Sequence, residues 1–163
     1  MPVGLSRLVK GPVLIVRTVR RLTLVARAPG RVHLGRNSVV GPGARVARGA
    51  VLRTGSNVSI GANFVCEVDL TVGDDVMISS NVSFIGNDHS FDEAGRTITE
   101  QAPLPRAKAT VRGDNLIGFG TIVLGSVTVG RGAIVGAGSL VTSSLPDEMI
   151  AVGRPARAVR RRR

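Results

Sequence analysis

One of the two histidines in this chain stands among carboxylates. Residues 86–93 read GNDHSFDE, so His89 directly follows Asp88 and precedes Asp92 and Glu93 by three and four residues. An imidazole titrates near neutrality, and an adjacent carboxylate can hold its tautomer and raise its basicity. A general base for a hydroxyl or an amine needs these properties. His89 is therefore our candidate catalytic residue, although a solvated loop histidine fits the local sequence equally well.

The other candidate ligands argue against a metal centre or a disulfide. Cys66 is the single cysteine, and no group of cysteines and histidines has metal-ligand spacing. His33 stands alone in Arg31-Val32-His33-Leu34, where we expect a surface side chain. A reducing compartment suits one free cysteine, and arginines interrupt every apolar run that could form a signal peptide or a membrane span. We therefore expect a cytoplasmic protein without a bound metal.

Positive charge gathers at the two ends of the chain. The 163 residues carry a net charge of +11, with seven basic residues and no acid in 1–31 and six arginines and no acid in 154–163. Proteins that bind single-stranded nucleic acid interleave aromatic residues for stacking, whereas this chain has four Phe, no Trp and no Tyr. We therefore expect no nucleic-acid partner.

An apolar residue recurs at every sixth position over most of the chain. The column comprises Leu34, Val40, Val46, Leu52, Ile60, Cys66, Val72, Ile78, Phe84, Val111, Ile117, Val123, Val129, Val135 and Val141. Neither a helix nor a single strand has this period. A solenoid does, if each hexad is a short strand with its corner and three hexads complete a triangular coil. Cys66 is then a small core residue.

Two interruptions break the period. The step from Leu52 to Ile60 is eight residues, which predicts a bulge or a coil boundary in 53–59. The step from Phe84 to Val111 is 27 residues, which predicts an insertion over 86–110. Loops of this length in compact domains are commonly functional, and this one carries His89.

The segment before the solenoid has the pattern of a basic amphipathic helix. Its apolar side would comprise Leu5, Leu8, Val9, Val16 and Val19, and its basic side Arg7, Lys10, Arg17 and Arg21. Pro12 would kink a continuous helix or start a second one. Such a helix can cover the open end of a solenoid or lie on an anionic membrane surface. We favour the cap, and both roles can hold at once.

Five stretches resemble the hexapeptide-repeat acyltransferases, in particular the maltose, galactoside and polysaccharide O-acetyltransferases. They are 72–83 (VGDDVMISSNVS) continuing to Asp88-His89, 113–120 (GDNLIGFG), 127–130 (VTVG), 135–142 (VGAGSLVT) and 152–157 (VGRPAR). Ile98 and Gln101 resemble the polysaccharide-linked members. The resemblance implies an all-β fold, a left-handed parallel β-helix, over 32–160. Residues 1–31 form the N-terminal segment and 161–163 a basic tail.

The resemblance also implies roles for individual residues. His89 would deprotonate the acceptor, and the backbone amide of Phe119 would polarise the thioester carbonyl. The coenzyme A contacts would be Ala137, Thr142, Ser143, Arg157 and Arg160. Asn63 and Asp69 match acceptor-side residues only weakly, and a corner Asn and a turn Asp are alternatives at least as good. Leu116 stands where the family commonly has a tryptophan, which leaves the acceptor open.

These roles together imply an acetyl-CoA-dependent O-acetyltransferase acting on a sugar or polysaccharide hydroxyl, assembled as a homotrimer with each site between two subunits. An amino-sugar N-acetyltransferase is an alternative, because a histidine base serves an amine as well. A non-enzymatic, membrane-associated scaffold is another. A γ-type carbonic anhydrase is disfavoured, since each metal there requires three histidine ligands.

Overall fold

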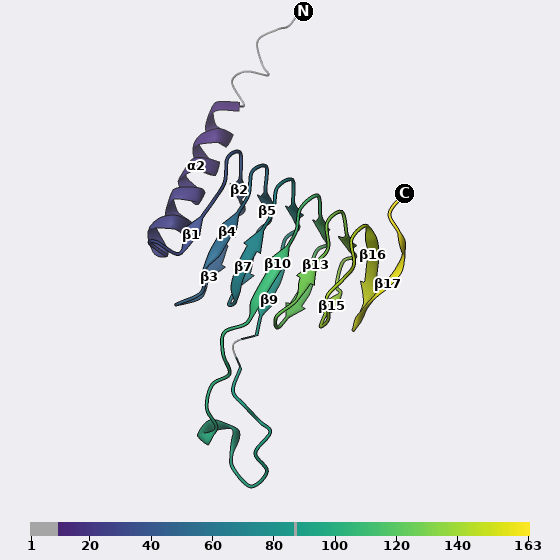
Figure 1. Ribbon diagram of the computed structural model, residues 1–163. Coiled ribbons are helices and arrows are strands. Elements are labelled where there is room, and N and C mark those ends of the chain that lie inside the picture. The colour runs from purple at the N-terminus through teal and green to yellow at the C-terminus, as the bar shows by residue number, and fades with distance from the viewer. Residues whose placement is uncertain (1–9, 87) are drawn as a thin grey trace, which may run out of the picture.

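The computed structural model describes residues 10–86 and 88–163, which form a triangular parallel β-solenoid with one helix at its N-terminal end (Figure 1). Sheet A contains β1 (Val32–His33), β4 (Leu52–Thr54), β7 (Asp69–Val72), β10 (Lys108–Val111) and β13 (Thr128–Val129). Sheet B contains β2 (Val39–Val40), β5 (Ser59–Ile60), β8 (Met77–Ile78), β11 (Leu116–Ile117), β14 (Ile134–Val135), β16 (Met149–Gly153) and β17 (Ala156–Arg161). Sheet C contains β3 (Arg45–Val46), β6 (Val65–Cys66), β9 (Ser83–Ile85), β12 (Ile122–Leu124) and β15 (Leu140–Val141).

Consecutive coils stack with a period of three hexads. Ile60 pairs with Ile78, and Cys66 pairs with Phe84, each 18 residues further along the chain. Two coils later Val111 pairs with Val129 at the same spacing. The predicted fold, a β-solenoid with a triangular coil of three hexads, is confirmed.

The core consists of two inward columns on each sheet. The hexad column is buried except for Leu34 and Val46 in the first coil, which are half-buried. Most positions four residues later are also buried. One of them, Phe64, packs against Phe84 of the hexad column, with 6.0 Å between the ring centroids. Each fully buried aliphatic side chain contributes about 1.5–3 kcal/mol. Cys66 lies in this core, and its burial raises the pKa of the thiol to about 12.

The first predicted interruption lies in a different place from the one expected. Leu52 pairs with Leu70, and Thr54 pairs with Val72, so Thr54 occupies the hexad position and Leu52 the second column. The two extra residues therefore lie between Val46 and Leu52, not in 53–59. The period alone could not distinguish these assignments, because alternate residues of one strand both face the core here.

The insertion extends from Gly86 to Ala107 and contains one short 3-10 helix, η1 (Ile98–Glu100). Residues 108–110, which the sequence analysis placed in the insertion, belong to β10. Because β9 lies in sheet C and β10 in sheet A, the insertion leaves the solenoid at the corner between these two sheets. It projects sideways from the coil stack (Figure 1).

The N-terminal segment contains one helix, α2 (Lys10–Arg27), with Pro12 in its first turn, where no intrahelical N–H bond is lost. Leu5, Arg7, Leu8 and Val9 lie outside the described residues. Leu24 and Ala28 are buried against the first coil, whereas Val16 and Val19 are exposed, so the predicted apolar side is not the side that packs on the solenoid. No helix of the described ranges is long and apolar enough to cross a membrane.

Three corners join the sheets, and we name them AB, BC and CA after the sheets they connect. Asparagine or aspartate occupies many of the corner positions in the left-handed region, for example Asn57 (φ 59°) and Asn63 (φ 55°). Short polar side chains tolerate this conformation, which costs other residues about 1–2 kcal/mol. At the C-terminal end β17 pairs antiparallel with β16 and covers the edge of sheet B.

Candidate active site

His89 lies at the base of the insertion, where it forms a β-bridge with Pro103. Its Nδ1 lies 3.0 Å from the backbone carbonyl oxygen of Gln101. A carbonyl only accepts hydrogen bonds, so Nδ1 carries the proton and donates it. The lone pair of the neutral ring is then on Nε2, and the side chain is exposed. This is the tautomer that a general base requires.

The partner of His89 differs from the one suggested by the sequence. The adjacent carboxylates were expected to hold the tautomer, but the described bond goes to a backbone carbonyl. Glu93 instead forms an ion pair with Arg96, with 2.6 Å between Oε2 and Nη1. The backbone of Asp88 is also part of the hairpin, since its carbonyl accepts a bond from the Leu104 amide at 2.8 Å. A hairpin carbonyl therefore replaces the carboxylate.

Gln101 organises the insertion around the histidine. Gln101 is only 3% exposed, although it lies in a segment that is otherwise largely exposed. The side-chain Oε1 accepts a bond from the Glu93 amide at 3.2 Å, and Nε2 donates to the carbonyls of Glu93 and Arg96 at 3.3 Å each. The same residue thus crosslinks the insertion and holds Nδ1 of His89. The sequence indicated Gln101 only as part of the resemblance.

At the BC corner the described backbone amides of Ser80, Phe119 and Ala137 have no acceptor. In an earlier coil the Ala62 amide donates to the Ser80 hydroxyl of the next coil at 3.0 Å. Phe119 and Ala137 occupy the same corner position in later coils, where the following coil offers no hydroxyl at that place. No described residue accepts a bond from either of these amides or from that of Ser80. Phe119 is 56% exposed, so these donors are open to a ligand.

The remaining predicted coenzyme A contacts lie at two other places. Thr142 and Ser143 are exposed on the CA corner, the corner from which the insertion emerges two coils earlier. Arg157 and Arg160 are exposed on β17, where Nη1 of each bonds to a neighbouring backbone carbonyl at 3.1 Å. Neither guanidinium is paired with a carboxylate in the described structure, so both can meet phosphate groups.

Asn63 and Asp69 have structural partners. Asn63 adopts the left-handed conformation at the BC corner, and its Nδ2 donates to Oδ1 of Asn81 at 3.0 Å. Asp69 begins β7, and its Oδ1 accepts a bond from the Val51 amide at 3.0 Å. Both side chains therefore join consecutive coils, in agreement with the corner and turn roles that the sequence left open.

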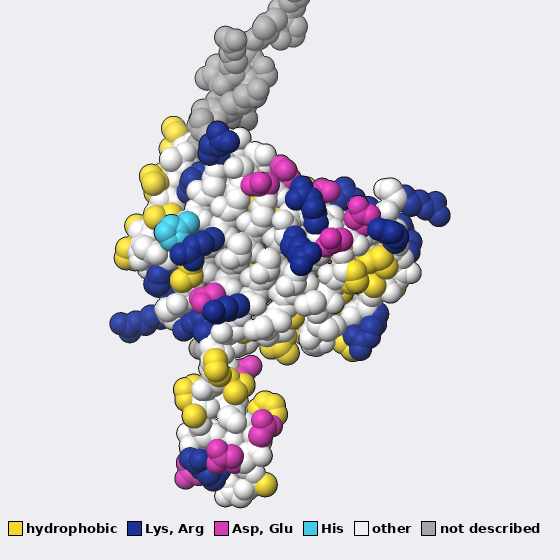
Figure 2. Space-filling view, viewed as in Figure 1, with side chains coloured by type: hydrophobic (Ala, Val, Ile, Leu, Met, Phe, Trp, Pro, Cys, Tyr) yellow, Lys and Arg dark blue, Asp and Glu magenta, His cyan; other side chains and the backbone are white. Residues whose placement is uncertain are grey.

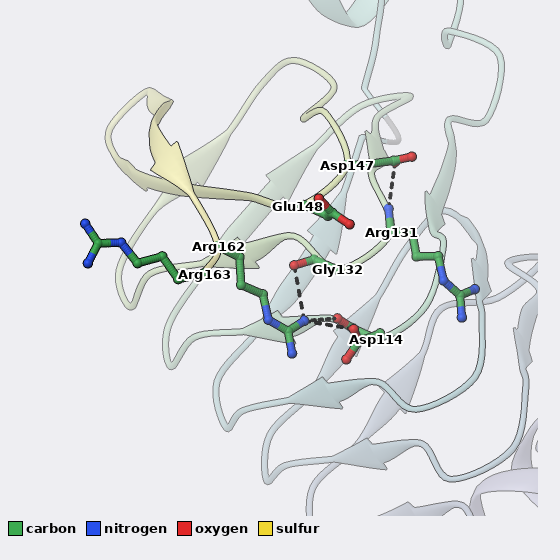
Figure 3. A pocket seen from close by; sticks show the side chains of 7 residues that line it. All are labelled: Asp114, Arg131, Gly132, Asp147, Glu148, Arg162 and Arg163. Carbon is green, nitrogen blue, oxygen red and sulfur yellow. Dashed lines mark hydrogen bonds and ion pairs between the residues drawn. The ribbon is translucent and has the colours of Figure 1, made fainter.

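A charged depression of about 300 Å³ lies at the AB corner near the C-terminus (Figure 3). Arg162 reaches into it from the end of β17, with Nη1 2.9 Å from Oδ2 of Asp114. The preceding Arg161 pairs with Glu148 at 2.9 Å. The carboxylates of Asp114 and Glu148 thus already form ion pairs with arginines of the same chain. These pairs hold the end of β17 against the solenoid, which argues against a ligand site here. Strand β17 extends to Arg161, the first residue of the predicted tail.

A single chain does not bring the proposed reacting groups together. His89 projects from the CA corner, whereas Phe119 and Ala137 lie on the BC corner, with sheet C between them. The five residues from Gly120 to Leu124 cross this face, which makes it roughly 15 Å wide at about 3.3 Å per residue. Within one chain these two sets of groups therefore lie on different corners, separated by the width of sheet C. Among the described residues no group of three His, Cys, Asp or Glu could hold a metal ion.

Comparison with known proteins identifies relatives over most of the chain, although no protein-family model matches it. Galactoside O-acetyltransferase of Escherichia coli strain K12 is 31% identical over 131 residues, which cover 76% of this chain and 63% of that protein. A hexapeptide-repeat acetyltransferase of Vibrio cholerae O1 biovar eltor, solved with acetyl-coenzyme A, is 30% identical with a TM-score of 0.70 and coverages of 80% and 71%.

A third similar protein is AntD, an N-acyltransferase from Bacillus cereus solved with dTDP and 3-hydroxybutyryl-CoA. It is 26% identical, with a TM-score of 0.59 and coverages of 82% of this chain and 78% of that chain. The present chain spans about half the length of the curated relatives it matches. The repeat, the stacked coils and the extent of these similarities show that the chain belongs to the hexapeptide-repeat acetyltransferases, with their left-handed β-helix.

Proposed function

We propose that this chain transfers an acetyl group from acetyl-coenzyme A to a hydroxyl group of a sugar or polysaccharide, with His89 as the general base. The observation that carries the proposal is the bond between Nδ1 of His89 and the Gln101 carbonyl. It leaves Nε2 free to accept a proton at the exposed base of the insertion. The related E. coli O-acetyltransferase supports a saccharide hydroxyl as acceptor.

The reaction proceeds by direct attack, without a covalent enzyme intermediate. Nε2 of His89 takes the hydroxyl proton as the acceptor oxygen attacks the thioester carbonyl carbon. The amide of Phe119 donates to the developing oxyanion, and collapse breaks the carbon–sulfur bond. The leaving thiolate receives the proton from Nε2, which regenerates the neutral imidazole. General-base assistance of this kind accelerates a reaction by about 10²–10⁴-fold.

The outer faces of the solenoid support a homotrimer. On sheet B the outward residues Met77, Leu116 and Ile134 lie side by side in register, and on sheet C Ile122 pairs with Leu140. The outward row of sheet A is polar, with Thr71, Thr110 and Thr128 in register. The two apolar faces flank the BC corner, so a neighbouring chain would pack there. The insertion of one protomer then meets Phe119 and Ala137 of its partner.

Coenzyme A would lie along this junction. The amides of Phe119 and Ala137, one coil or about 4.8 Å apart, suit the thioester carbonyl and the pantetheine amide. Thr142 and Ser143 would lie near the nucleotide. Arg157 and Arg160, which are exposed and have no carboxylate partner in the described structure, suit its phosphates.

An N-acetyltransferase acting on an amino sugar is the second candidate. The structural similarity to AntD, an N-acyltransferase solved with dTDP, favours it. The same free Nε2 would accept a proton from an amine. The acceptor therefore distinguishes the two functions, whereas the base does not.

The test is thiol release from acetyl-coenzyme A with matched panels of hydroxyl sugars and amino sugars. The only protein thiol, Cys66, is buried, so it contributes little background. We expect turnover with a hydroxyl sugar and a loss of about 10²–10⁴-fold in kcat for His89→Ala. His33→Ala is the matched control, because His33 is exposed and bonds through Nε2 to the Gly30 carbonyl at 3.1 Å. Full activity of His89→Ala, or equal losses in both variants, would contradict the mechanism.

A further inference from the structure

Helix α2 presents an apolar stripe on the side that faces away from the solenoid. Ile15 and Leu24 are nine residues apart, which is two and a half helical turns, so they point to opposite sides. Leu24 is buried against the first coil, whereas Ile15, Val19 and Leu22 are 65%, 54% and 61% exposed. The exposed stripe continues at Ala26. Figure 2 shows hydrophobic side chains along this outer edge of the helix.

The sequence that includes α2 and the first two coils is rich in positive charge and contains no acid before Glu67. Residues 1–66 contain eleven Lys and Arg and no Asp or Glu, while the other 97 residues contain eleven of each sign. Among the described residues seven of these arginines are exposed: Arg17, Arg20, Arg27, Arg36, Arg45, Arg48 and Arg53. The four ion pairs of the described structure all lie beyond residue 92, so none neutralises this end.

Charge and apolar surface are arranged together on the helix. With 100° per residue, Arg20 and Arg27 lie about 110–130° from the centre of the stripe, on one side and towards Leu24, so their long side chains must extend around the helix to reach headgroups beside the stripe. Arginine stems can cover apolar surface while the guanidinium reaches phosphate groups. The exposed arginines of the first two coils lie within about 10 Å of the solenoid end, which is one Debye length at moderate salt.

We propose that α2 docks this end of the solenoid on an anionic phospholipid bilayer, with Ile15, Val19 and Leu22 in the interface and the arginines on the headgroups. An anionic bilayer offers both an apolar layer and negative charge, whereas a second copy of this helix would bring together two positive surfaces. The cap and the membrane contact then use opposite sides of one helix, Leu24 and Ala28 on one side and the stripe on the other.

The proposed trimer strengthens the contact. If the three solenoids pack side by side and parallel, three copies of α2 lie at one end and can bind one surface together, and binding then exceeds the single-helix affinity through multivalency. This part rests on the proposed trimer, whereas the stripe and the charge do not. The insertion leaves the solenoid after the third coil, about 15 Å from this end, which places the reaction close to the bilayer surface.

The experiment uses the full chain with tryptophan as a reporter, since the chain contains no Trp or Tyr. In Leu22→Trp we expect the emission to shift to the blue on addition of vesicles with about one third phosphatidylserine, but not with pure phosphatidylcholine. Replacing Arg20 and Arg27 by Gln in this background should weaken binding by roughly 30-fold, at about 1 kcal/mol for each basic residue near the surface. The matched control replaces Arg131 and Arg154, exposed arginines remote from α2, and should bind unchanged.

Several outcomes would overturn the docking. An emission that is already blue without lipid and that changes on dilution would show that a second copy covers the stripe. Equal binding to both vesicle types, or equal weakening in both arginine variants, would remove the role of the charge on α2. Turnover of a soluble sugar by a variant that has lost vesicle binding would leave the proposed reaction intact, so the two proposals fail separately.

Discussion

The AB and BC corners repeat the same turn in successive coils. Among the described residues, however, hydrogen bonds accepted by a side chain of the next coil occur in both the early and the late coils of the AB corner and only in the early coils of the BC corner. At the AB corner Nδ2 of Asn37 donates to Asn57, and Nδ2 of Asn57 donates to Asp75 at 2.9 Å. Near the C-terminus the Arg131 amide still donates to Asp147, at 2.8 Å. At the BC corner the corresponding side-chain bonds end at Ser80 and Asn81.

The difference separates structural corners from functional ones. Where polar side chains cap the amides of the preceding coil, the corner holds the stack together. Where Phe119 and Ala137 follow, the amides stay unbonded at an exposed edge. Free backbone donors on a rigid solenoid are preorganised for an oxyanion or a ligand carbonyl. The following variants test this distinction, beginning with the one expected to have the largest effect.

Removing the Phe119 amide should have the largest effect. Phe119→Pro deletes the N–H, and the first coil already carries Pro42 at this corner position, so the turn accepts proline. We expect kcat to fall by about 10²–10³-fold, as for loss of one oxyanion donor. Phe119→Ala keeps the N–H and should retain most of the activity. Equal kcat in the two variants would show that the amide is not used.

Giving the Phe119 amide a hydrogen-bond acceptor at the BC corner should have an intermediate effect on kcat. Ala137→Ser places a hydroxyl 18 residues after Phe119, just as Ser80 follows Ala62 by 18 residues and caps its amide. We expect the new bond to add about 0.5–1.5 kcal/mol to the free energy of unfolding and to compete with the substrate, which lowers kcat by roughly tenfold. Thermal unfolding and thiol-release kinetics measure the two effects. A rise in kcat would contradict the assignment of Phe119.

Substituting Asn57 at the AB corner should lower the stability of the fold without lowering kcat. Asn57 has φ of 59° and bonds to both Asn37 and Asp75. Asn57→Ala should lower the free energy of unfolding by about 1–2 kcal/mol, because alanine is strained in this conformation. Asn57→Gly should lower it by less, because glycine adopts the conformation freely. Denaturant unfolding measures both, and a lower kcat at saturating substrate in either variant would argue that the AB corner contributes to catalysis.

Much of the fold was predictable, because a solenoid repeats its local rules along the chain. Thirteen of the fifteen predicted inward positions are buried, and the other two, Leu34 and Val46, lie in the first coil. The six-residue period does not assign Leu52 to the correct inward column. Its partner Leu70 and the pairing of Thr54 with Val72 place it in the second inward column, and a hydrophobic residue fits either column equally well.

The chain alone determined the repeat, the insertion, the catalytic histidine candidate and the basic N-terminal segment, because each depends on residue type and spacing. Only the tertiary structure decided which partner holds His89, since the Gln101 carbonyl approaches it through the folded hairpin. It also decided which amides stay open at the BC corner and that the exposed stripe of α2 is opposite to Leu24. These features depend on neighbours from other coils, and one-dimensional spacing does not contain them.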